Sequence, residues 1–217
     1  MPIDKRTVIA VCIVGSAAWL YSRQSQAAQL TAGIDAGLQA QGGIFDTLTN
    51  GANTLMDTVK TGFLSVPDAV NNPNVQAFLK VIRTGEGTTD AGGYSRCFGG
   101  SAFYSFADHP RQKHTGGGIT STAAGAYQFL ITTWDEMAGK YALPDFSPAS
   151  QDIAAVGLIK RRGALADVIA GNFTTAIAKC SKEWASLPGS PYGQPTISLN
   201  KAYQVLALNG ATEGVAA

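Results

Sequence analysis

The sequence predicts an α+β fold that is mainly helical, with one small lobe built from loops or a hairpin. Three stretches place apolar residues three, four or seven positions apart, as on one face of a helix; they lie at 75–82, 127–137 and 173–184. Between 87 and 120 the chain becomes Gly-rich instead and carries five aromatic residues. This change is typical of an irregular lobe in which the backbone turns sharply.

Capping residues predict where the helices begin and end. The first is expected to end near Gly85, since glycine commonly follows a last helical turn. Another should begin at Ser147-Pro148, because serine is a favoured N-cap and proline suits the first turn. Its cationic last turn, which the helix dipole favours, should stop at Gly163. A last short helix is expected over 199–208.

The 217-residue chain is predicted to have four regions of different character. They are an apolar, signal-anchor-like segment at 1–25, an amphipathic helical linker or assembly region at 26–72, a globular core at 73–195, and a short helix with a frayed tail at 196–217. The globular core is long enough to carry an active site of its own.

The first region is an uncharged run at 7–21, preceded by Lys5 and Arg6 and followed by Arg23. It is shorter than the roughly 20 residues that span a bilayer, so inner-membrane insertion through 7–22 is marginal. The basic pair predicts a cytoplasmic N-terminus and export of the remainder. A cleaved signal peptide, a permanent anchor and a conditional anchor stay open, and Arg23 favours an uncleaved segment.

Residues 28–71 carry a helical stripe of a different kind. Aspartates recur there every 11 residues, at Asp35, Asp46, Asp57 and Asp68, and apolar residues follow helical steps. A striped helix must bury its apolar face against something. Three interpretations remain: a loosely helical linker, weakened by its glycines; a homo-oligomer; or attachment to virion proteins.

Composition excludes several function classes. The net charge of +1 does not indicate a nucleic-acid partner. No CxxC or paired His/Cys spacing is present, so no metal site and no cofactor is expected. Cys97 and Cys180 are either free buried thiols or one bridge, with free thiols favoured. His109 and His114 lack the partners of a nucleophilic triad.

Glu86 differs from the other acids of the core by its context. It follows the apolar face of the first helix directly and stands between Gly85 and Gly87. A carboxyl against an apolar wall has a raised pKa, as a general acid requires. Gly-Glu-Gly alone is a weak signal, and by itself a solvated loop glutamate is the simpler interpretation.

Several ordered blocks change that interpretation, because the region from Ala77 to Gln194 resembles the lysozyme-like endolysins of the phage lambda type, which are lytic transglycosylases. The blocks include Glu86-Gly87-Thr88, Asp108-His109-Pro110-Arg111, Tyr127-Gln128, Ser150-Gln151-Asp152 and Trp184-Ala185-Ser186-Leu187-Pro188-Gly189. They occur in the same order as in the family, and agreement is loosest between Asp90 and Phe103. The resemblance implies a lysozyme-like domain at 73–195.

The resemblance also implies a reaction, cleavage of the β-1,4 bond between N-acetylmuramic acid and N-acetylglucosamine in peptidoglycan. Glu86 would protonate the leaving oxygen and then act as base on the C6 hydroxyl, which gives a 1,6-anhydro product. One carboxylate can then suffice where glycoside hydrolases use two. The alternatives are a hydrolytic muramidase and a module that binds glycan without cutting it.

Other site residues follow from the same blocks. Tyr127 and Gln128 are expected to bind glycan, although Tyr127 fits a core position equally well. Tyr192 and Gln194 are expected to line a subsite. Asp90 is the runner-up partner of Glu86, whereas Asp108 is expected to be structural or to support the site indirectly.

The biological role is predicted less directly. The region at 28–71 favours a phage virion enzyme that opens the host cell wall during genome entry. The alternatives are an endolysin exported by its own signal-anchor for host lysis, and a transglycosylase of a bacterial secretion machine. The expected location is therefore the virion, or the host inner membrane and periplasm.

Overall fold

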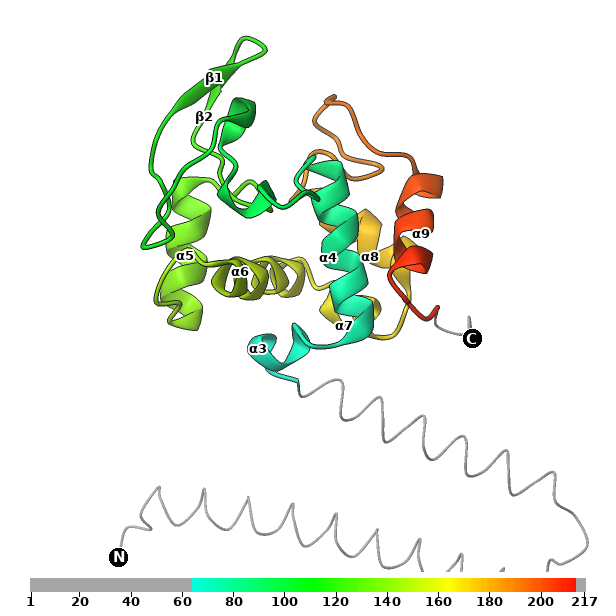
Figure 1. Cartoon of the computed structure of the whole chain (residues 1–217). Coiled ribbons are helices and arrows are strands. Elements are labelled where there is room, and N and C mark those ends of the chain that lie inside the picture. The colour runs from blue at the N-terminus through cyan, green and yellow to red at the C-terminus, as the bar shows by residue number, and fades with distance from the viewer. Residues whose placement is uncertain (1–63, 214–217) are drawn as a thin grey trace, which may run out of the picture. The chain divides into compact units, whose positions relative to one another are not determined.

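The computed structural model describes residues 64–213. Seven helices are described there: α3 (Val66–Ala69), α4 (Pro73–Gly85), α5 (Ile131–Tyr141), α6 (Pro148–Arg161), α7 (Leu165–Ile169), α8 (Phe173–Cys180) and α9 (Leu199–Leu208). The only sheet within 64–213 pairs β1 (His114–Gly116) with β2 (Ile119–Ser121), and short 3-10 turns lie at Gly93–Ser95 and Phe98–Gly100. The predicted mainly helical α+β fold with a small hairpin lobe is confirmed (Figure 1).

The predicted segment at 7–22 and most of the stripe at 28–71 lie outside the described residues. Within 64–213, no helix has the length and hydropathy needed to cross a membrane. The end of the stripe is visible in α3, where Val66 and Ala69 are buried in the core.

Capping side chains explain where α4 and α6 begin, and the start of α6 at Ser147-Pro148 was predicted. Helix α4 begins where the Asn72 side chain accepts hydrogen bonds from the backbone of Asn74 and Val75, with proline in the first turn. Helix α6 begins in the same way at Ser147, whose hydroxyl accepts from the Ser150 amide. In both, the capping side chain satisfies N–H groups that have no partner inside the helix.

Two helical stripes were predicted to be longer than the helices they mark. Helix α5 begins at Ile131 rather than near Tyr127, because Gln128 has a positive φ of 51° that a helix does not allow. Helix α8 ends at Cys180, and Trp184 lies in the turns that follow. Tyr127 and Trp184 are both buried. The helical spacing of apolar residues therefore predicted which residues are buried, but not where the helices begin and end.

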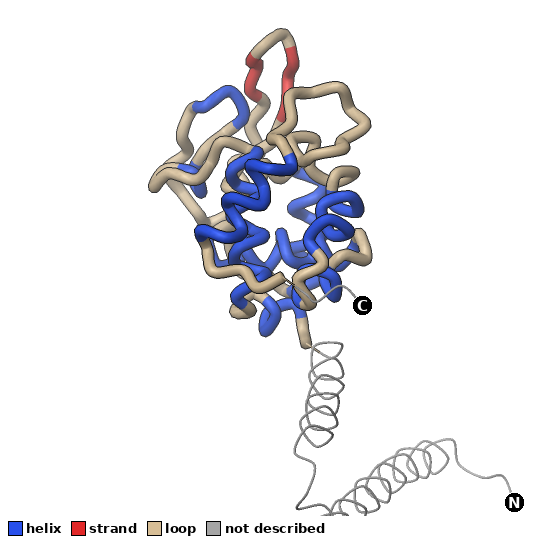
Figure 2. Tube along the Cα trace, turned by 90° about the vertical axis from the view of Figure 1, so that its right-hand side faces the viewer, coloured by secondary structure: helices blue, strands red, loops and turns tan. Residues whose placement is uncertain are grey.

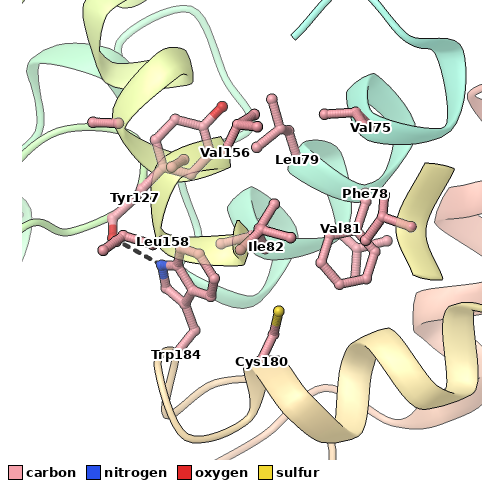
Figure 3. Packing of buried hydrophobic residues seen from close by; sticks show 14 of the residues in the cluster. Val75, Phe78, Leu79, Val81, Ile82, Tyr127, Val156, Leu158, Cys180 and Trp184 are labelled. Carbon is pink, nitrogen blue, oxygen red and sulfur yellow. Dashed lines mark hydrogen bonds between the residues drawn. The ribbon is translucent and has the colours of Figure 1, made fainter. Parts of the chain in front are cut away.

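The core fills the space between α4, α6 and α8. Figure 3 shows Ile82 from α4 facing Leu158 from α6, with Trp184 beside them. Trp184 Nε1 donates to the carbonyl of Tyr127 at 3.2 Å, which ties the segment after α8 to the one before α5. Cys97 and Cys180 are both buried free thiols.

Helix α9 packs beside α4, although the two are far apart in sequence (Figure 1). Ala202, Val205 and Leu206 are buried in the common core. The Asn74 side chain bridges to the Thr212 backbone, as donor at 3.0 Å and as acceptor at 2.8 Å. The chain therefore stays part of the globular unit as far as Thr212.

The hairpin lobe stands apart from the helices at one end of the domain (Figure 2). Its strands pair antiparallel with His114 opposite Ser121. The turn between them is Gly117-Gly118, and both glycines have positive φ, at 57° and 78°. A two-residue turn with two positive φ angles matches the twist of a hairpin, and glycine adopts it without steric cost.

Candidate active site

A cleft of about 660 Å³ lies where the end of α4, the loop after α8 and the hairpin lobe come together. Figure 1 shows the end of α4 between the green lobe and the orange loop that leads to α9. Residues from all three line it, among them Glu86, Arg96, Ile119, Gln128, Ser186 and Gln194. Segments from the whole length of the globular unit therefore form its walls.

Glu86 is fixed at the cleft by the way α4 ends. It is the C-cap residue, and Gly87 after it has a φ of 67°. The amide of Gly87 donates to the Thr84 carbonyl, and the amide of Thr88 donates to that of Arg83 at 2.9 Å. This is a Schellman motif, which needs a left-handed residue after the cap. Gly87 thus determines where the helix stops and where Glu86 points.

Ser186 contacts the Glu86 carboxyl from the other side of the cleft. Its hydroxyl donates to Glu86 Oε1 at 2.6 Å, across 100 positions of sequence. The contact requires Gly85, because a Cβ atom at that position would lie 2.5 Å from Ser186 Oγ and 3.0 Å from its Cβ. The two glycines around Glu86 therefore act differently. Gly87 allows the helix to end in a Schellman motif, and Gly85 leaves space for the Ser186 side chain.

The electrostatic setting of Glu86 suits proton transfer. Burial raises the pKa of its carboxyl, and the hydrogen bond from Ser186 lowers it in part. Among the described residues, Glu183 is the other acid that lines the cleft, and its side chain is only 9% exposed. Arg161 and Arg162 form ion pairs with Glu183 at 2.6 and 2.7 Å. Glu86 has no such ion pair with any residue of 64–213, so its carboxyl is the better candidate for proton transfer in this cleft.

Tyr127 forms part of the cleft floor but is held from behind. Only 2% of it is exposed, and its hydroxyl donates to Asp152. Tyr94 donates to the same carboxyl at 2.8 Å, and the guanidinium of Arg83 lies over the Tyr94 ring. Tyr127 therefore offers the cleft a surface to pack against, while its hydroxyl belongs to a buried network.

Gln128 and Gln194 both lie in the cleft lining. The Gln128 amide nitrogen donates to the carbonyls of Arg96 at 3.2 Å and Gly125 at 2.9 Å. Its amide oxygen accepts no hydrogen bond from residues 64–213, so it can accept one from an N–H group of a ligand. This arrangement fits the predicted contact of Gln128 with glycan, since N-acetyl sugars carry an amide N–H.

Tyr192 is placed differently from the other expected ligand contacts. It is not among the residues that line the cleft, and 56% of it is exposed. Its hydroxyl donates to the Lys182 carbonyl at 3.0 Å. The cleft ends on this side with Gln194 and Pro195.

The two aspartates of the hairpin lobe are both paired with arginines. Asp90 is bound by Arg96 at 2.8 Å, and this hydrogen bond lowers the pKa of its carboxyl. Arg96 lines the cleft and donates to the Gly87 carbonyl at 2.7 Å, so Asp90 supports the end of α4 through Arg96. Neither aspartate lines the cleft itself.

Asp108 supports a different part of the fold. Arg111 bridges it to Asp135 on α5, with contacts of 2.7 and 2.6 Å. Trp134 Nε1 also donates to Asp108, at 3.2 Å. The hydrogen bond from Arg111 holds the pKa of the Asp108 carboxyl below its usual range. Asp108 therefore fastens the lobe to α5.

Two site residues were missed from the sequence, Ser186 and Arg96. Ser186 stands in the longest resembling block, Trp184-Ala185-Ser186-Leu187-Pro188-Gly189, but nothing in the sequence distinguishes this serine from its neighbours. Arg96 lies where the resemblance is loosest.

No group of three or more His, Cys, Asp or Glu side chains within 64–213 is placed to hold a metal ion.

Comparison with known proteins assigns the chain to a protein family. The family model for Endolysin matches residues 76–213, well over half of the chain. The chain belongs to the endolysin family. The predicted resemblance is thus confirmed, and the enzyme is a lysozyme-like, glycan-cleaving protein.

Two curated relatives and two solved structures agree with this family assignment. The endolysin of Escherichia phage lambda is 43% identical over 132 residues, covering 58% of this chain and 83% of the relative. That of Escherichia phage P2 is 39% identical over 156 residues, covering 64% and 94%. Bacteriophage lambda lysozyme complexed with a chitohexasaccharide matches with a TM-score of 0.62 at 39% identity, covering 65% of this chain and 97% of the other. A second structure of lambda lysozyme gives 0.58 at the same identity.

Proposed function

We propose that the enzyme is a peptidoglycan lytic transglycosylase, which cleaves between N-acetylmuramic acid and N-acetylglucosamine and leaves a 1,6-anhydro end. The observation that carries the proposal is that Glu86 is the one carboxyl of the described cleft without an ion pair. The lambda lysozyme structure bound to a chitohexasaccharide supports a glycan in this cleft.

The proposed reaction uses Glu86 twice. Its protonated carboxyl donates a proton to the glycosidic oxygen, and the bond between that oxygen and C1 of the muramic acid breaks. The resulting carboxylate then removes the proton of the C6 hydroxyl, whose oxygen forms a bond to C1. Glu86 ends protonated as it began, and no water is consumed. A buried carboxyl with a raised pKa suits both steps, because it keeps its proton to a higher pH than an exposed carboxyl does.

A two-carboxylate hydrolysis has less support. Retaining and inverting glycosidases place a second carboxylate about 5–10 Å from the acid, as nucleophile or as base for a water. Glu183 is held by two arginines, and Asp90 lies outside the cleft lining with Arg96 bound to it. Both pairings disfavour a nucleophilic role.

The products distinguish the two reactions. Purified cell-wall sacculi are digested in heavy-oxygen water, and the fragments are weighed by mass spectrometry. A transglycosylase gives anhydro-muramyl ends without heavy oxygen, whereas a muramidase gives reducing ends one water heavier that carry the label. Labelled reducing ends as the main product would overturn the proposal, and intact sacculi would favour a module that only binds glycan.

The role in the phage cycle is a separate proposal. The relatives of which the chain covers 83% and 94% are the endolysins of phages lambda and P2, which supports a role as an endolysin in host lysis. Insertion of 7–22 into the inner membrane, with the catalytic unit in the periplasm, would accomplish the export. The virion role predicted from 28–71 stays a prediction. Detection of the chain in purified particles would favour the virion, and detection only in lysates would favour lysis.

A further inference from the structure

A second pocket continues the cleft along the hairpin lobe. It has a volume of about 400 Å³ and is lined by Lys113, Thr120, Ser121, Thr122 and Leu130. Ser121 and Leu130 also line the main cleft, so the two spaces share a wall. A glycan bound in the cleft would therefore have this pocket beside it, open to a substituent that leaves the sugar chain.

The hydroxyls of this pocket are arranged to donate. Ser121 Oγ accepts from the Ala123 amide at 3.1 Å, and Thr122 Oγ1 accepts from the Ile131 amide at 3.4 Å. Each hydroxyl also carries one proton, for which residues 64–213 offer no acceptor. Both protons are therefore free for an acceptor on a ligand.

The charge of the pocket favours an anion. Lys113 supplies an ammonium group with no hydrogen-bond or ion-pair partner among the described residues, and none of the lining residues is acidic. Helix α5 begins at this point, since its N-cap residue Leu130 is part of the lining, and the positive end of its dipole adds to the effect. Leu130, which is 46% exposed, gives a small apolar surface beside these donors.

We infer that this pocket binds a carboxylate of the peptide stem that peptidoglycan carries on the lactyl group of its muramic acid. The stem combines carboxylates with small apolar side chains, and the pocket offers an ammonium, two hydroxyl donors and the exposed Leu130. The inference rests on the proposed function, because only a glycan bound in the main cleft would lie beside this pocket. Lys113 is then a specificity residue, and it takes no part in the proton transfers of Glu86.

The test compares two substrates that differ only in the stem. Sacculi carry the peptides, and treatment with an amidase yields the same glycan strands without them. The variant Lys113→Gln removes the charge at an exposed position, Lys113→Arg keeps it, and Lys201→Gln makes the same change on α9, away from the lobe (Figure 1). Lys113→Glu reverses the charge.

On peptide-bearing strands, Lys113→Gln should lower kcat/KM by about two- to fivefold, mainly through KM, and Lys113→Glu by about tenfold. Lys113→Arg and Lys201→Gln should match the wild type. On peptide-free strands all four variants should equal it. An equal loss on both substrates, or no loss with Lys113→Glu, would overturn the inference while the proposed function stands. A wild type that cleaves neither substrate would overturn the proposed function and this inference with it.

Discussion

The two walls of the cleft are built in different ways. The helical wall, from the end of α4 to Ser186, holds Glu86 through a Schellman motif and a hydrogen bond between distant segments. The wall from the hairpin lobe has two strands of three residues each and side chains that are largely exposed, such as Ile119 at 52%. Buried, mutually constrained groups suit proton transfer, and exposed groups suit contacts with a long polymer.

The carboxyl at the end of α4 and the two carboxyls of the hairpin lobe show a similar contrast. Within the part of the chain that the structure describes, Glu86 is buried without an ion-pair partner, and its pKa is raised. Asp90 and Asp108 are paired with arginines, and their pKa values are lowered. A carboxyl with a raised pKa keeps its proton to a higher pH, so a carboxyl of the first kind is the better proton donor. Whether an acid is paired with a cation therefore distinguishes the proposed catalytic acid, Glu86, from the two aspartates that support the fold.

The largest expected effect comes from Glu86→Gln. Because the variant can neither donate nor accept the proton, activity on sacculi should fall by at least about a thousandfold. A turbidity assay on purified cell walls measures the loss. Activity within tenfold of the wild type would contradict the assignment of Glu86.

The same variant should not be less stable at neutral pH. The folded-state pKa of Glu86 lies above the unfolded value near 4.5, so the wild type loses stability as pH rises through that interval. Glu86→Gln removes this loss. Its Tm should exceed that of the wild type at neutral pH, and the difference should shrink below about pH 4.5. A lower Tm at neutral pH would show that the ionised carboxyl stabilises the fold.

The second-largest effect on activity is expected from the glycines beside Glu86, and the two should respond differently to substitution. Gly85→Ala would push Ser186 and the carboxyl apart, and activity should fall by about a hundredfold. Gly87→Ala meets no atom within 4 Å but forces alanine into a left-handed conformation. It should lower the unfolding free energy by about 1–2 kcal/mol and reduce activity less. Denaturant unfolding together with kcat measurements tests the pair, and equal kcat losses would contradict the distinction.

Removing the Ser186 hydroxyl should have an intermediate effect. Its hydrogen bond lowers the pKa of Glu86, so Ser186→Ala should raise that pKa further and move the alkaline limb of the pH–rate profile upward. The kcat should fall by about tenfold, because the carboxyl also loses its orientation. Ser186→Thr keeps a hydroxyl and should retain the wild-type limb. If the alkaline limb is unshifted in Ser186→Ala, the hydrogen bond between Ser186 and Glu86 is absent in the enzyme–substrate complex.

The smallest effect is expected in the hairpin lobe. Asp90→Asn keeps the shape of the side chain and weakens an exposed ion pair with Arg96. Activity should stay within about twofold of the wild type, and Tm should not change measurably. A large loss of kcat without unfolding would move Asp90 into the catalytic machinery and revive the two-carboxylate hydrolysis.

Much of the fold was predictable because it depends on neighbours in sequence. The cap at Ser147 and the helix end near Gly85 depend on residues within a few positions, so both could be predicted from the sequence. Helix lengths were less predictable. The burial of Tyr127 and Trp184 continued the apolar spacing beyond the ends of α5 and α8.

The sequence alone determined the helical class of the domain, the hairpin lobe, the end of α4 and, through ordered family blocks, the choice of Glu86. Only the tertiary structure decided what surrounds that carboxyl. Ser186, 100 positions away in sequence, donates a hydrogen bond to it. Arg161 and Arg162 form ion pairs with Glu183. Asp152 accepts a hydrogen bond from the Tyr127 hydroxyl. The physical reason is that a pKa and a binding surface depend on which distant groups the packed core brings within a few ångströms.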